Sequence, residues 1–188
     1  MQTQFVILLK PLQQYRIPYT GLKTGKYQFE YEIDSHFFDE FEYSIVKSGQ
    51  LSVKLELEKQ ETFLILQFHI FGEIQLSCDV CLANYPSKID TKQRLIAKFS
   101  GDEEWDNETD EVIILTKNDH EIDVSLPIYE YINLAAPYVS RCGEEGDTSS
   151  CDQEMIAKLK ALSGKQNEQK KDVDPRWDAL KNIQTNKN

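Results

Sequence analysis

Residues 64–81 read LILQFHIFGEIQLSCDVC, and this stretch decides how the chain folds. Apart from Gly72, large apolar side chains fill its even positions from Leu64 to Leu76, while most odd positions are polar. This period of two is typical of a strand with one buried face. The pattern keeps its phase through Gly72, so we expect a bend there rather than a shift of register. Cys78 therefore arrives on the core face of a long strand.

The segments on either side of this stretch repeat the period of two. Apolar side chains occupy odd positions over residues 51–57, and the inner face of a returning strand is predicted over residues 89–99. The Cys-Asp-Val-Cys sequence then lies at the tip of a long antiparallel hairpin. The outer face of the returning strand carries four basic side chains: Lys88, Lys92, Arg94 and Lys98.

The patterns at the two ends of the chain complete the predicted fold. Strands are expected over residues 4–9 and 27–33, and Ser35 is a candidate N-cap for a short helix over residues 36–43. Helical spacing over residues 125–136 ends at Pro137, and a further helix runs from the cap Asp152 to Leu162. We predict an α+β fold, with an antiparallel sheet or partial barrel built around the long hairpin and helices in the C-terminal third.

The last residues differ in composition from the rest of the chain. We predict one α+β domain over residues 1–164, followed at 165–188 by a mobile linker and a short docking helix. Asp174 is the expected N-cap of that helix, Pro175 and Arg176 fill its first turn, and Trp177 lies on one face with Leu180.

Length, charge and cysteine content limit the class of protein. The chain has 188 residues, four cysteines and no apolar run close to the roughly 18 residues that indicate a membrane helix. Its N-terminus lacks the basic region of a signal peptide, so we expect a cytoplasmic protein. The net charge is −11, with +4 over residues 155–188 and −15 over the remainder. Such an acidic body argues against tight nonspecific binding of polyanions.

The four cysteines allow three interpretations. Cys78, Cys81, Cys142 and Cys151 together form a possible tetrahedral zinc site. Three features argue against zinc. The last two cysteines are separated by eight residues, and three of these are acids: Glu144, Glu145 and Asp147. Leu82 also stands where a glycine, which adopts the required backbone conformation easily, often follows a metal knuckle. Reduced cysteines that pack as small apolar side chains are the second interpretation. A thiol oxidoreductase is the third, although strands flank the pair and Asp79 lies between the thiols, unlike redox pairs at a helix N-terminus.

The basic outer face has two interpretations as well. Lys88, Lys92, Arg94 and Lys98 are suited to contact the phosphates of a nucleic acid, yet an exposed sheet face is normally charged. If this face contacts RNA, the acidic body predicts weak and salt-sensitive binding.

Several short motifs together resemble the YceD-type family, named for accumulation of large-subunit ribosomal RNA. The sequence Cys78-Asp79-Val80-Cys81-Leu82, the segment 122–137 that ends at Pro137, and the late cysteines Cys142 and Cys151 match its pattern. So does the terminal motif, which consists of Asp174, Pro175, Arg176, Trp177 and Leu180. Many members carry a denser late cysteine cluster than this chain.

The resemblance implies a non-enzymatic factor for the synthesis, processing or stability of bacterial large-subunit (23S) ribosomal RNA. The expected partners are the ribosomal RNA precursor or ribosome-assembly proteins. Binding to a membrane is not expected. A zinc-stabilised adaptor that binds protein, and a thiol oxidoreductase that uses Cys78 and Cys81, are the competing functions.

Overall fold

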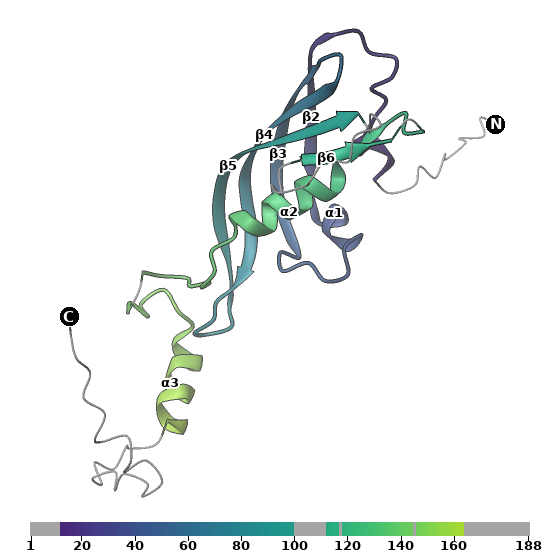
Figure 1. The fold of residues 1–188 in the computed structure, drawn as a ribbon. Helices are drawn as coiled ribbons and strands as arrows, with labels where there is room; N and C mark the ends of the chain where they lie inside the picture. Colours follow the sequence, from purple (N-terminus) through teal and green to yellow (C-terminus); the bar gives the residue numbers. More distant parts are fainter. Residues whose placement is uncertain (1–11, 100–111, 117, 145, 164–188) are drawn as a thin grey trace, which may run out of the picture.

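A computed structural model shows a long curved sheet with helices on one face and a third helix beyond the hairpin tip (Figure 1). It describes residues 12–99, 112–116, 118–144 and 146–163. The elements in chain order are η1 (Gln13–Tyr15), β1 (Arg16–Ile17), β2 (Gly25–Ile33), α1 (Ser35–Asp39), β3 (Ser48–Lys59), β4 (Phe63–Ser77), β5 (Asn84–Phe99), β6 (Val112–Leu115), β7 (Ile122–Asp123), α2 (Ser125–Ala135) and α3 (Gln153–Leu162).

The main sheet is open and has the order β2-β3-β4-β5-β6. All of its neighbouring strands are antiparallel except β5 and β6, which run parallel from the pair Ile96 and Val112. Strands β1 and β7 form a separate antiparallel pair. The predicted α+β class is confirmed, and the sheet does not close into a barrel.

The hairpin of β4 and β5 is continuous from the pair Phe63–Lys98 to the pair Ser77–Asn84. Gly72 stays in register with Ile89 on one side and Leu51 on the other, which confirms that the register does not shift there. A Cβ atom at Gly72 would lie 2.4 Å from the backbone oxygen of Gln50, and its φ of +146° is one that other residues rarely adopt.

The core lies between the inner face of the sheet and the helices α1 and α2. Leu55, Leu66 and Ile70 are almost completely buried, because every second residue of each strand points to this face. Helix α2 adds Ile128 and Ile132, which are also fully buried. The opposite face of the sheet is polar and partly open to solvent.

Most helix predictions agree with the structure, and one needs correction. Helices α2 and α3 have the expected ranges, and Asp152 accepts hydrogen bonds from the backbone of Glu154 and Met155 as the cap of α3. Helix α1 ends at Asp39 instead of Tyr43, and Asp34 rather than Ser35 caps it, by accepting from the His36 N–H. The carboxylate of Asp34 reaches that N–H group, so the helix begins one residue earlier. The predicted strand at 4–9 and the terminal segment 165–188 lie outside the described residues.

Replacing Gly72 with alanine tests the close contact between β3 and β4. We expect a loss of about 2–3 kcal/mol in the free energy of unfolding, measured with urea, because the added methyl meets backbone atoms and φ is positive. Gly21→Ala is the control, since nothing lies within 4 Å of its added methyl group. Equal stability of the two variants would contradict this account of the bend.

Candidate metal centre

The first cysteine pair forms a tight turn at the end of the hairpin. The Cys78 N–H donates to the Ala83 oxygen at 2.9 Å, and the Leu82 N–H donates to the Cys78 oxygen at 2.8 Å. Leu82 adopts the left-handed conformation, with φ of 62°, at the position where the sequence lacks the usual glycine. The turn therefore has the backbone conformation of a metal knuckle, even though leucine takes the place of glycine. Leu82 is 68% exposed.

The second cysteine pair is gathered by hydrogen bonds within its own loop. The Asp147 carboxylate accepts from the backbone and hydroxyl of Ser149, and the Cys151 N–H donates to the Thr148 oxygen at 3.1 Å. The Gln153 side-chain amide adds a bond to the Cys151 oxygen at 2.9 Å. These bonds hold the part of the loop from Asp147 to Cys151 in a compact turn, so the long spacing does not keep the two thiols apart.

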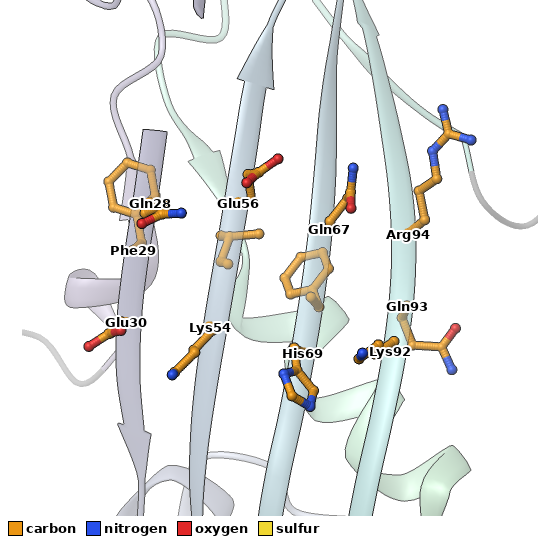
Figure 2. Close-up of a pocket in the computed structure, with 12 residues that line it drawn as sticks. Gln28, Phe29, Glu30, Lys54, Glu56, Gln67, His69, Lys92, Gln93 and Arg94 are labelled. Carbon is orange, nitrogen blue, oxygen red and sulfur yellow. The ribbon is translucent and has the colours of Figure 1, made fainter. Parts of the chain in front are cut away.

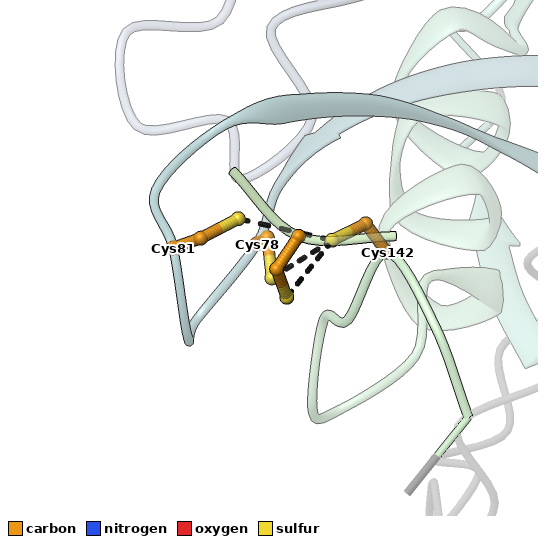
Figure 3. A group of neighbouring side chains, drawn as sticks. Cys78, Cys81 and Cys142 are labelled. Carbon is orange, nitrogen blue, oxygen red and sulfur yellow. Dashed lines mark hydrogen bonds between the residues drawn. The ribbon is translucent and has the colours of Figure 1, made fainter. Parts of the chain in front are cut away.

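All four sulfur atoms meet in one cluster (Figure 3). The Cys142 Sγ lies 3.3 Å from that of Cys151, 3.6 Å from that of Cys78 and 3.7 Å from that of Cys81. All four lie within 4.8 Å of one another. A tetrahedral zinc ion with bonds of about 2.3 Å places its sulfur ligands about 3.8 Å apart. The arrangement is thus compatible with one metal ion held by four cysteines.

Burial, backbone donors and neighbouring thiols shift the pKa values of Cys78 and Cys142 in opposite directions. Burial opposes ionisation of Cys78, but backbone N–H groups of Cys81, Cys142 and Val80 outweigh it and lower its pKa to about 6. The pKa of Cys142 is raised to about 12, first by its contact with Cys151 and then by burial. Several thiolates at such short distances repel one another unless a cation lies between them. Cys78, Cys81 and Cys151 are at most 7% exposed, which suits a closed site.

Asp79 has a role that its sequence position did not reveal. Its carboxylate accepts from the Ser140 N–H at 2.7 Å, while the Asp79 N–H donates to the Ser140 oxygen at 2.7 Å. These two bonds fasten the knuckle to the segment that leads to Cys142. The sequence gives no signal for this contact, because Asp79 bonds to the backbone of Ser140 and not to its side chain.

One of the acids between the late cysteines also has a structural role. Asp147 caps the turn at Ser149, and these hydrogen bonds lower the pKa of its carboxyl group. Its charge therefore serves the fold of the loop. Glu144 is exposed, and Glu145 lies outside the described residues.

The remaining predicted site residues lie away from the cysteines. Lys88, Lys92 and Arg94 are exposed on the outer face of β5, as expected, and Lys98 is half-buried near its end. The terminal motif of Asp174, Pro175, Arg176 and Trp177 lies outside the described residues. Whether the basic side chains contact RNA stays a prediction. Within the described ranges, no helix has the length and apolar character needed to cross a membrane.

Comparison with protein families identifies the chain. The model of a family described as "Large ribosomal RNA subunit accumulation protein YceD" matches residues 66–184. The chain belongs to the YceD family. The YceD match begins within β4 and includes all four cysteines, so the candidate metal centre lies inside the part that defines the family. No curated protein and no solved structure matches the chain.

Asp79→Ala tests the contact between the knuckle and the late loop of this YceD chain. We expect a loss of about 1 kcal/mol in the free energy of unfolding, because the Ser140 N–H loses its acceptor. Glu61→Ala removes the same charge from an exposed turn and should have little effect. The prediction is wrong if urea unfolding gives the two variants the same stability.

Proposed function

We propose that this YceD-family chain is a non-enzymatic factor in the bacterial cytoplasm that supports the synthesis, processing or stability of large-subunit (23S) ribosomal RNA. The family match over residues 66–184 carries this proposal, because the family is described by accumulation of that RNA. The ribosomal RNA precursor, or proteins that assemble the large subunit, are its partners.

The proposed cofactor is one structural zinc ion bound by Cys78, Cys81, Cys142 and Cys151. Thiolates are the ligands that zinc prefers, and four of them satisfy its tetrahedral coordination with no open position. The sulfur separations of 3.3–3.7 Å around Cys142 support this assignment. The ion joins the hairpin tip to the N-terminus of α3, so metal affinity becomes part of the folding free energy.

The burial of the thiols supports a structural role over a redox role. Cys78 is completely buried and Cys81 is 2% exposed, whereas a redox pair must meet its substrate. Cys78 follows a strand and does not itself open a helix, unlike the first cysteine of thioredoxin-type sites. A zinc-stabilised adaptor that binds protein is the second candidate, and the −15 charge outside residues 155–188 favours it.

Replacing Cys78 and Cys81 with serine tests the role of the thiols. We expect the variant to lose bound zinc and to unfold at lower temperature, and to restore less 23S ribosomal RNA in cells that lack their own family member. Ser150→Ala, an exposed change beside Cys151, is the control. Thiol–disulfide turnover by the wild type that disappears in an intact double variant would instead support the oxidoreductase.

Replacing Lys88, Lys92, Arg94 and Lys98 with glutamine tests the basic face. We expect weaker association with the large-subunit precursor in gradient sedimentation, with the difference shrinking as salt rises, since fewer phosphates are neutralised. Unchanged association at low salt would assign recruitment to protein partners.

A further inference from the structure

The outer face of the sheet carries a groove that the metal centre does not explain (Figure 2). It spans β2 to β5 and has a volume of about 730 Å³. A second hollow of about 580 Å³ follows along β4 and β5, beside Phe71, Lys88 and Asp90. Together they form a surface on the face opposite the helices, and we call it the outer groove.

A row of basic side chains crosses the floor of the outer groove. The strand register places Lys54, His69 and Lys92 opposite one another on β3, β4 and β5. Neighbouring strands lie about 4.8 Å apart, so the backbones of Lys54 and Lys92, on either side of His69, are about 10 Å apart. The long side chains of the two lysines can converge on one anion bound above His69. Arg94, two residues further along β5, lies opposite Gln67 and extends the basic row.

Aromatic rings lie directly beside this row. The ring centres of His69 and Phe71 are 4.9 Å apart, and the Lys54 ammonium lies 5.7 Å from the centre of the Phe71 ring. Phe71 is half-buried on the solvent side of the sheet, where a ring has no core to fill. A partly exposed ring next to cations is the combination that holds an unpaired base by stacking and its phosphate by charge.

Two acids in the outer groove have ion-pair partners, and two others lie opposite a lysine. Glu56 forms an ion pair with Lys26 at 2.8 Å, and its pKa is lowered by that contact. Asp90 pairs with the His69 ring at 2.9 Å. Glu30 lies opposite Lys54, and Glu73 lies opposite Lys88. Lys92 and Arg94, on β5, therefore carry the positive charge that faces no carboxylate on the neighbouring strand.

We propose that the outer groove binds single-stranded RNA. Lys54, Lys92 and Arg94 contact phosphates, and Phe71 with His69 stacks on a base. Duplex RNA keeps its bases stacked inside the helix, so a ring on a sheet selects unpaired nucleotides. The assignment rests on the proposed function, which supplies the class of RNA, and it adds Lys54, His69 and Phe71 to the basic residues of β5.

Binding is tested by fluorescence anisotropy with the full chain and a labelled single-stranded RNA of about 12 nucleotides. We expect weaker binding to the same RNA annealed to its complement. Lys54→Gln with Lys92→Gln should reduce the slope of log affinity against log salt by about 1.4, the value for two phosphate contacts on a single strand. Phe71→Leu should reduce affinity roughly tenfold with little change in that slope.

Two exposed lysines outside the outer groove provide a matched control. Lys23→Gln with Lys47→Gln removes the same charge and should leave the salt slope unchanged, since neither residue lines the groove. Equal affinity for duplex and single strand, equal slopes for the two double variants, or full affinity in Phe71→Leu would each overturn the site.

A cellular test separates failure of the site from failure of the proposed function. The ratio of 23S to 16S ribosomal RNA is measured in cells that lack their own family member. A wild-type chain that does not restore the ratio contradicts the proposed function. If the wild type and the Lys54→Gln, Lys92→Gln variant restore it equally, the outer groove is overturned while the function stands, and a protein partner carries the chain to the ribosome precursor.

Discussion

The meeting of four cysteine sulfur atoms at the tip of the β4–β5 hairpin determines where the C-terminal part of the described chain lies. Ile156, the buried residue of α3, packs in the cluster of Cys78, Cys81 and Cys151 and not in the main core. The hairpin strands β4 and β5 have 15 and 16 residues, so this cluster lies at the end of a long hairpin, away from the main core. Such a small group of side chains supplies little apolar burial. The zinc ion proposed for this cluster would add the bonding that holds α3 in place.

The regular alternation of apolar and polar side chains made much of the fold predictable. One alternation fixed the buried face from Leu64 to Leu76, and the turn chemistry of Asp152 located α3. The parallel pairing of β5 with β6 could not be foreseen, because β6 has four residues and no distinctive period. The extent of α1 was overestimated because aromatic side chains at 37–43 fit a helix and a turn equally well.

The candidate site was predictable in its residues but not in its geometry. The cysteines were identified by type, while their approach depends on the loop of Asp147 and on the bonds between Asp79 and Ser140. Both use backbone groups, which a sequence does not display. The outer groove was missed in part for a related reason, since Lys54, His69 and Lys92 form one row only through the register of three strands. In the proposed RNA site the acidic body and the basic row would act together, because general repulsion of polyanions would leave the groove as the favourable contact.

X-ray absorption at the zinc edge of the purified, zinc-loaded chain tests the central claim most directly. The account predicts a single shell of four sulfur atoms at about 2.3 Å, contributed by the knuckle and the late loop together. A shell with fewer sulfur atoms completed by nitrogen or oxygen would contradict it, because the ion would then not join the two cysteine pairs.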